Sequence, residues 1–383
     1  MKHCLLAVAL IILTPVFAQT ERDAGVLTQV SHPALSAGPG LFSPASPGPY
    51  RVGRTTLSYI DGDRDDRPVV MDVWYPVDAA DAAGVAPSTY DLVFAALESP
   101  VALATPAVSQ NGPFPLLLFS HGNLGIRFQS FFLTEALASH GYIVVAPDHA
   151  GNTAFDLAFN TLEPFEVSAV NRPQDISFTI DRMLERNNLA GDEFLGRIDP
   201  ARIAVLGHSF GGYTTLAMAS GIDGVTADVR VKALIPIAPA SGILSDVQLI
   251  SITKPTLILG GSADITTPVD PQSSRPFELL SSPERQRVDL NEAGHQSFSN
   301  ICIFTDTLVD VGIDPALVAF LLGNAAEGCA PELMPIDVAH RLTQLYVVAF
   351  LKTYLDGDAR YAPFLTPLFG SGKGLPVTIF VPE

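Results

Sequence analysis

The chain has 383 residues, of which 48% are hydrophobic, so it is long enough to bury a large core without help from metal ions. It carries 40 acidic and 22 basic side chains, a net charge of −18, and no run of basic residues. This charge argues against nucleic acid and anionic membrane surfaces as partners.

The first 18 residues have the layout of a secretory signal. A basic start is followed by an apolar stretch, Leu5–Leu13, and by a small-residue cleavage site that ends at Ala18. The apolar stretch is shorter than the roughly 20 residues that a membrane-spanning helix needs. We therefore expect a secreted or periplasmic protein that keeps no membrane span after cleavage.

The next segments differ in composition. Residues 19–50 are rich in Pro, Gly, Ser and Ala without any period, which predicts an extended arm. Residues 51–77 read as two strands around an acidic turn, and residues 78–112 are expected to form a surface insertion. Residues 51–383 as a whole are predicted to be a single domain.

Beyond residue 112, short apolar runs alternate with helical stretches. The runs are FPLLLFSHG, YIVVAPDHA, RIAVLGHS, KALIPIAPA, PTLILGGSAD and QRVDLNEAGH. This pattern predicts an α/β fold with a mostly parallel sheet that is covered by helices on both faces. Function collects at the carboxyl ends of such strands, and those ends carry His121, Asp148, Ser209, Asp264 and His295.

Ser209 is the predicted nucleophile. The segment RIAVLGHSFGG leaves only residues 207–211 to turn a buried strand into a helix, so Ser209 stands at the tip of a tight, strained reversal. Gly207 and Gly211 have no Cβ to clash where strand and helix approach each other. This form, G-x-S-x-G between a strand and a helix, is typical of a nucleophile elbow.

A serine hydroxyl needs a base to take its proton and an acid to orient that base. His295 and Asp264 follow later strands and give the chain order Ser–Asp–His that this topology requires. Asp246 and Asp270 remain alternative acids, and His149 remains an alternative base.

The oxyanion of the reaction needs two hydrogen-bond donors. We expect them to be the backbone amides of Phe210, which follows the nucleophile, and of Asn123 in the loop after the first core strand. Leu124 is the alternative to Asn123. His121, in the same loop, is expected to brace it by hydrogen bonds and not to act in catalysis.

The mature chain would keep two cysteines, Cys302 and Cys329, and export favours a disulfide between them over two buried thiols. They lie in residues 301–334, which we expect to be a helical, cap-like insertion. Residues 151–170 form a second expected insertion near the strand ends. The chain has neither paired histidines at helical spacing nor a cysteine cluster, so we expect no metal and no cofactor.

Four segments, WYPV, LLLFSHGNLGIRFQSFFLTEALASHGYIVVAPDHAGN, RIAVLGHSFGG and AGHQSF, resemble the α/β-hydrolase superfamily. Within it, residues 51–298 are similar to the platelet-activating-factor acetylhydrolases and the bacterial predicted dienelactone hydrolases. The resemblance implies an eight-stranded, mostly parallel sheet, a serine-hydrolase mechanism without a cofactor, and carboxylic esters as substrates.

The chain departs from that branch at two positions. Dienelactone hydrolases carry a cysteine at the elbow, where this chain has Ser209. Acetylhydrolases place their acid after the strand that follows the elbow helix, but IPIAPAS has no acid there, and Asp264 one strand later resembles the placement in cutinases and many other esterases.

The sequence thus predicts an esterase that works through an acyl-enzyme on small-molecule, lipid or polymer esters. A peptidase or amidase on the same fold is the alternative enzyme. A catalytically inactive binding protein is the alternative from another class.

Overall fold

The computed structural model describes residues 42–382, apart from residues 94 and 315–317. The described residues all lie in one compact unit. The expected signal, residues 1–18, and residues 19–41 of the expected arm lie outside the described part.

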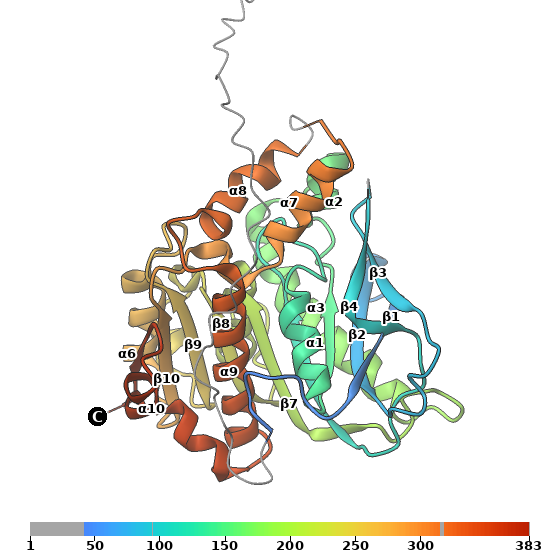
Figure 1. Ribbon diagram of the computed structural model, residues 1–383, viewed down its shortest axis with the longest axis horizontal. Coiled ribbons are helices and arrows are strands. Elements are labelled where there is room, and N and C mark those ends of the chain that lie inside the picture. Colours follow the sequence, from blue (N-terminus) through green and yellow to red (C-terminus); the bar gives the residue numbers. More distant parts are fainter. Residues whose placement is uncertain (1–41, 94, 315–317, 383) are drawn as a thin grey trace, which may run out of the picture. The chain divides into compact units, whose positions relative to one another are not determined.

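The described strands form one sheet of eleven, in the order β11-β10-β9-β8-β7-β5-β6-β2-β1-β4-β3 (Figure 1). They are β1 (Arg51–Asp61), β2 (Arg67–Val77), β3 (Pro87–Asp91), β4 (Ala96–Ala104), β5 (Phe114–Ser120), β6 (Ile143–Pro147), β7 (Ile198–His208), β8 (Val231–Ile237), β9 (Thr256–Gly261), β10 (Arg285–Leu290) and β11 (Val377–Phe380).

All neighbouring strands from β10 to β6 are parallel, whereas β2 runs antiparallel to both β6 and β1. These eight strands, β1, β2 and β5–β10, are the predicted mostly parallel sheet, and the fold class is confirmed. Three further strands extend it. β11 pairs with β10, and β4 joins β1 through Val52 and Ala102, so part of residues 78–112 continues the sheet.

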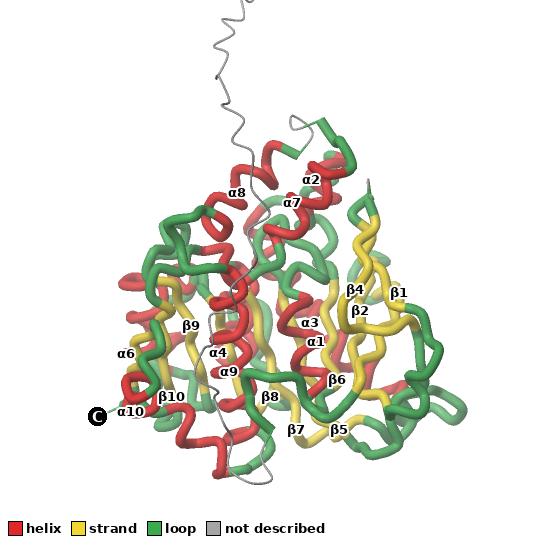
Figure 2. Tube along the Cα trace, in the orientation of Figure 1, coloured by secondary structure: helices red, strands yellow, loops and turns green. Residues whose placement is uncertain are grey.

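Ten α-helices connect or flank the strands in the described part (Figure 2). They are α1 (Phe131–Ser139), α2 (Ala154–Phe159), α3 (Phe165–Arg186), α4 (Phe210–Ser220), α5 (Asp246–Ile250), α6 (Arg275–Leu279), α7 (Ile301–Asp310), α8 (Ala319–Cys329), α9 (Ile336–Tyr354) and α10 (Pro367–Gly372). Across residues 42–382, gaps aside, none of the helices is both long and apolar enough to cross a membrane.

The core has two layers because successive side chains of a strand point to opposite faces of the sheet. Leu117 and Phe119 of β5 pack into the layer that contains α1 and α9. Leu116 and Leu118 of the same strand pack into the layer that contains α3 and α4. Helices therefore cover both faces, as the uninterrupted apolar runs predict.

Two of the segments expected as insertions contain helices beyond one end of the strands. Figures 1 and 2 show α2, α7 and α8 together above the sheet. α2 lies within residues 151–170, and α7 and α8 lie within residues 301–334. They adjoin the edge at which β7, β9 and β10 end.

Candidate active site

The turn at Ser209 has the strained backbone that the sequence predicts. β7 ends at His208 and α4 begins at Phe210, so Ser209 alone connects them, with φ 59° and ψ −116°. A non-glycine residue with positive φ is uncommon, and such strain concentrates at functional sites. Two backbone hydrogen bonds fix the turn, from the Ser209 amide to Ile237 (2.8 Å) and from the Ala240 amide to Ser209 (2.9 Å).

Glycine is required on both sides of this turn. A Cβ at Gly207 would lie 2.4 Å from the Gly211 carbonyl oxygen. A Cβ at Gly211 would lie 1.8 Å from the carbonyl oxygen of Ser120, at the end of β5. The glycines therefore let α4 start directly against the strands, and this close approach aims the Ser209 hydroxyl past the strand ends.

The structure brings Ser209, His295 and Asp264 together. Nε2 of His295 lies 2.9 Å from Oγ of Ser209, and Nδ1 of His295 lies 2.8 Å from Oδ2 of Asp264. Asp264 follows β9 and His295 follows β10, so adjacent parallel strands deliver the two side chains to one edge of the sheet. The expected nucleophile, base and acid thus form the hydrogen-bonded series that nucleophilic catalysis by serine requires.

The surroundings of Asp264 keep this carboxylate charged. Burial alone would raise its pKa, but hydrogen bonds from His295 and from the amide and hydroxyl of Thr267 outweigh burial and lower the pKa. The Thr267 hydroxyl also lies 3.0 Å from both Nδ1 of His295 and the carbonyl oxygen of Ala238. Thr267 therefore fixes the acid on both oxygens, a role that the sequence analysis missed.

The alternative residues lie elsewhere. Asp246 begins α5 and pairs with Arg275 at the surface, and Asp270 is exposed. Asp148 accepts hydrogen bonds from the amide and guanidinium of Arg127. Neither Asp246 nor Asp270 hydrogen-bonds to a histidine among the described residues, so Asp264 is the acid that the geometry favours.

The alternative base, His149, belongs to a second cluster of the same residue types. Its Nε2 lies 2.9 Å from Oγ of Ser120, and its Nδ1 lies 2.9 Å from Oδ2 of Asp175. All three side chains have no exposed surface. Burial lowers the pKa of His149 to about 3, so its imidazole is neutral. The His121 ring lies 4.9 Å from the His149 ring, tilted by 51°, and its Nε2 accepts the His149 amide, which ties the loop after β5 to the end of β6.

The expected oxyanion donors lie on either side of Ser209. Phe210 is the first residue of α4, where amides lack a helical acceptor. Asn123 follows β5, and its neighbour Leu124 has φ 54°. Within the described part of the chain, the amides of Asn123, Leu124 and Phe210 have no protein acceptor. Their role as oxyanion donors remains a prediction, and both candidates in the loop stay open on these contacts.

A cavity of about 200 Å³ opens onto these groups. Ser209, His295, Asn123 and Leu124 line it. Most of its surface is apolar, with contributions from Ile126, Ala154, Ile301, Phe304 and Leu321. Six polar side chains also line it: Gln129, His208, Thr266, Gln296, Ser299 and Asn324. α7 and α8 supply three of those apolar side chains, so the helical insertion forms a wall of the cavity.

Two polar residues that the sequence analysis missed, His208 and Gln129, connect the loop after β5 with the turn of His295. His208, inside the G-x-S-x-G motif, donates from Nε2 to the carbonyl oxygen of His295 (2.9 Å). Its Nδ1 accepts from Gln129 (2.8 Å), whose side-chain oxygen accepts the Gly122 amide (2.9 Å). Burial and the neighbouring charge of His295 lower the pKa of His208 to about 3, so this imidazole stays neutral and can both donate and accept. The loop after β5 and the turn of His295 are thereby held in one network.

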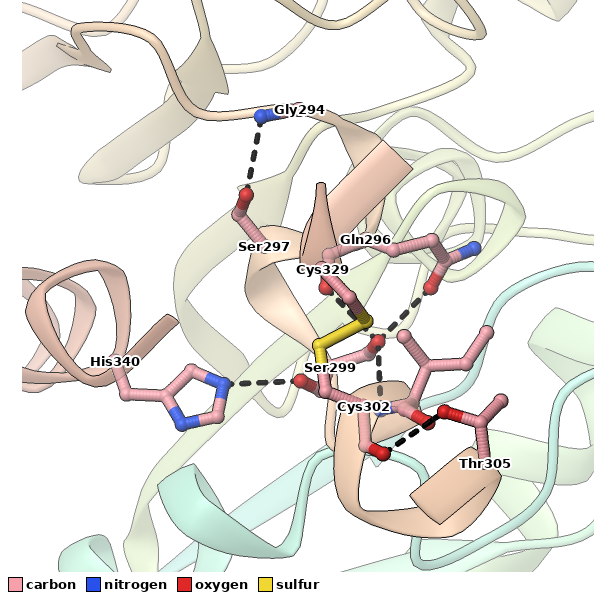
Figure 3. The surroundings of a disulfide bond; sticks show 9 residues. Gly294, Gln296, Ser297, Ser299, Cys302, Thr305, Cys329 and His340 are labelled. Atoms are coloured by element: carbon pink, nitrogen blue, oxygen red, sulfur yellow. Dashed lines mark hydrogen bonds between the residues drawn. A yellow bond between two sulfur atoms is a disulfide. The ribbon is translucent and has the colours of Figure 1, made fainter. Parts of the chain in front are cut away.

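The predicted disulfide is confirmed: Cys302 in α7 is bonded to Cys329 at the end of α8 (Figure 3). It lies beside the turn of His295. A Cβ at Gly328 would lie 2.7 Å from the backbone of Gln296, and one at Gly294 would lie 2.3 Å from the carbonyl oxygen of Glu327. The bond therefore holds the end of α8 against the turn that carries His295.

Metal ligands are not gathered anywhere in the described part: no group of three His, Cys, Asp or Glu side chains is placed to hold an ion there.

Several known proteins share sequence with the region that contains the site. A family model described as PET hydrolase-like matches residues 118–305, which include Ser209, Asp264 and His295.

Cutinase est1 of Thermobifida alba is 28% identical over 260 residues, which cover 67% of this chain and 66% of that protein. Cutinase of Thermobifida fusca (strain YX) is 27% identical over 260 residues, 67% of this chain and 65% of that protein. Bis(hydroxyethyl) terephthalate hydrolase of Streptomyces coelicolor is 25% identical over 265 residues, 69% of this chain and 64% of that protein. The chain spans just under two thirds of the length of these three relatives. The acetylhydrolase branch suggested by the sequence is not confirmed by these matches.

Proposed function

We propose that the chain is a secreted serine hydrolase of carboxylic esters and a member of the α/β-hydrolase superfamily that it resembles. One observation carries the proposal. Ser209, His295 and Asp264 form a continuous hydrogen-bonded series, and the serine is at the tip of a strained turn that borders a cavity.

In the proposed first step, Oγ of Ser209 attacks the ester carbonyl carbon while Nε2 of His295 takes the hydroxyl proton. The charge of Asp264 stabilises the imidazolium, and its hydrogen bond to Nδ1 keeps the ring in the productive tautomer. The imidazolium then gives its proton to the departing alcohol, and the acyl group stays on Ser209. Water, deprotonated by His295, releases the acid in the second step.

The negative oxygen of each tetrahedral intermediate would be stabilised by two backbone amides. Phe210 supplies one from the start of α4, and Asn123 supplies the other from the loop after β5. Both amides are without a protein acceptor in the described residues, which is what a preorganised oxyanion site needs. The aromatic ring of Phe210 is buried in the core, so only its backbone serves the site.

The substrate class proposed is apolar esters, including polyester fragments. The cavity wall is mainly apolar around Ser209, and the matched relatives are named as cutinases and as a hydrolase of bis(hydroxyethyl) terephthalate. Export is proposed from the sequence of residues 1–18 and agrees with the disulfide, which persists in oxidising compartments.

The test compares the wild type with Ser209→Ala on p-nitrophenyl butyrate and bis(hydroxyethyl) terephthalate. Turnover by the wild type and its loss in the folded variant are expected, and activity that survives Ser209→Ala would refute the assignment. A matched p-nitroanilide distinguishes the amidase alternative, because an esterase should cleave it far more slowly than the ester.

Fluorophosphonate labelling followed by peptide mapping adds an internal control. Ser209 should be labelled, whereas Ser120 should not, although it has the same hydrogen bonds to a histidine–aspartate pair. A protein that binds esters without cleaving them would leave both serines unlabelled, and that result would favour the inactive binding protein.

A further inference from the structure

A buried arginine lies behind the site and takes no part in the steps above. Arg172, in the third turn of α3, has no exposed surface. Its guanidinium donates four hydrogen bonds, to Thr214, Asn152, Ser120 and the carbonyl oxygen of His121. Each of its three nitrogen atoms therefore has at least one acceptor, as the burial of an arginine requires.

Arg172 reaches the Asn123 side of the oxyanion site by two routes. One route is direct, because Nη2 donates to the Ser120 hydroxyl (3.1 Å) and to the carbonyl oxygen of His121, at the start of the loop. The other is a relay: Nη1 donates to Oδ1 of Asn152 (2.7 Å), and Nδ2 of Asn152 donates to Oδ1 of Asn123 (2.9 Å). The position of Asn123 thus depends on the guanidinium.

The same side chain contacts the Phe210 side. Cζ of Arg172 lies 4.6 Å from the centroid of the Phe210 ring, a cation–π contact, and Nε donates to Thr214 in the first turns of α4 (3.1 Å). The Phe210 ring also stacks on Phe165, with the ring centroids 4.6 Å apart. Arg172 therefore contacts both segments that carry the expected oxyanion donors.

The charge of Arg172 is not cancelled by a directly bonded carboxylate. Its four acceptors are all uncharged, and no ion pair of Arg172 is found in the described residues. The nearby carboxylate, Asp175, is bound by Arg64, Arg67 and His149 instead. Burial lowers the pKa of Arg172 to about 9, and the charge of Asp175 opposes that effect, so the guanidinium is cationic at neutral pH.

We propose that Arg172 is a positioning residue for the oxyanion site: it aligns the Asn123 and Phe210 amides and supplies positive charge behind them. A fixed charge in a buried region favours an anion that forms nearby more strongly than it would in water. The inference rests on the proposed function, since it concerns the intermediates of that reaction. It predicts that Arg172 acts on the transition state more than on substrate binding.

The experiment measures kcat and KM on p-nitrophenyl butyrate for Arg172→Met, Arg172→Lys and Asn152→Asp, with circular dichroism to confirm folding. Methionine removes the charge and every donor. Lysine keeps the charge but cannot bond all four acceptors. Aspartate at position 152 still accepts from Arg172 but no longer donates to Asn123, so it tests the relay even where Arg172→Met fails to fold.

We expect kcat to fall at least about tenfold in Arg172→Met and Asn152→Asp, with KM changed less than about twofold. A boronic acid that forms a tetrahedral adduct with Ser209 should bind more weakly by a factor similar to the loss in kcat. Arg172→Lys should fall between the wild type and Arg172→Met.

Arg54→Met is the matched control. Arg54 is also buried and also lies over an aromatic ring, but its partners are Asp72, Ser88 and Thr89. Asp72 also pairs with Arg127 in the loop after β5, but none of the three partners hydrogen-bonds to Asn123 or Phe210 among the described residues. Its loss should lower stability without changing kcat or boronate affinity. The proposal is overturned if folded Arg172→Met and Asn152→Asp keep wild-type kcat, or if kcat falls while boronate affinity stays unchanged. An inactive, unlabelled wild type would instead reject the proposed function.

Discussion

Replacing Gly211 by alanine tests the close approach of α4 to the sheet. The added Cβ would lie 1.8 Å from the Ser120 carbonyl oxygen, 2.6 Å from the Ser120 carbonyl carbon and 2.9 Å from the His121 carbonyl oxygen. Non-bonded heavy atoms prefer about 3.5 Å, so helix and strand must separate by roughly 1.5 Å. The obstacles are backbone atoms, which cannot rotate away as a side chain would.

Overpacking of this kind costs about 3 kcal/mol, and more where only backbone can move. With an unfolding entropy of about 2.1 cal/mol/K per residue, this corresponds to a fall in Tm of about 4 °C in a protein of this size. Ser209 precedes Gly211 by two residues, and Ser120 begins the loop that carries Asn123. A shift of about 1 Å between them should lower kcat on the order of a hundredfold, because the catalytic groups no longer meet in line.

Differential scanning calorimetry and ester turnover measure the two effects. The control is Gly323→Ala in α8, where a Cβ meets nothing within 4 Å, so Tm and kcat should stay close to the wild type. A Gly211→Ala protein with unchanged Tm and full kcat would refute the argument that contact between α4 and β5 sets the turn of Ser209.

Two other predictions concern stability. Burial raises the pKa of Glu135 from its ordinary 4.5 to about 7, although hydroxyl hydrogen bonds oppose the shift, so the fold favours its protonated form. The free energy of unfolding should therefore fall by up to about 3 kcal/mol as pH rises from about 4.5 to above 7. Urea titrations at several pH values should show a weaker pH dependence of this free energy in Glu135→Gln than in the wild type. An equal pH dependence in both proteins would contradict the prediction. The disulfide closes a sequence separation of 27 residues, so replacing Cys302 and Cys329 by serine should lower the free energy of unfolding by about 3.5 kcal/mol on the chain-entropy estimate. The same replacement should also lower kcat, because it loosens the turn of His295. Unchanged Tm and kcat in that double variant, or in the reduced protein, would show that the disulfide supports neither.

The sequence predicts those parts of the site that have a motif or a position next to a strand in the local sequence. Ser209 has a turn motif between a buried strand and a helix, and Asp264 and His295 each follow a strand. Because parallel strands end at one edge, chain order alone brings the three side chains near each other. Cys302 and Cys329 are the cysteines left beyond the expected signal, so their pairing also follows from the sequence.

The residues that the sequence did not predict act across the fold. Gln129 and His208 meet only because β5 and β7 are neighbours, and Arg172 points inward from α3 with a sequence context that fits any amphipathic helix. The alternation of buried and exposed residues in β3 is too short to predict a strand, because only Ser88 and Tyr90 of its five residues are buried. Such contacts depend on strand order and helix rotation, which local patterns do not specify.

Ser120, His149 and Asp175 have a further consequence for recognising enzymes from coordinates. A template of interatomic distances would match this protein twice, since each set joins hydroxyl, imidazole and carboxylate at 2.8–2.9 Å. What separates the two sets is access: one serine borders a cavity, and the other is sealed within the core and also hydrogen-bonded by an arginine. Distances alone therefore do not distinguish a buried structural serine from a nucleophile. The deciding property is whether a substrate carbonyl can reach the serine hydroxyl.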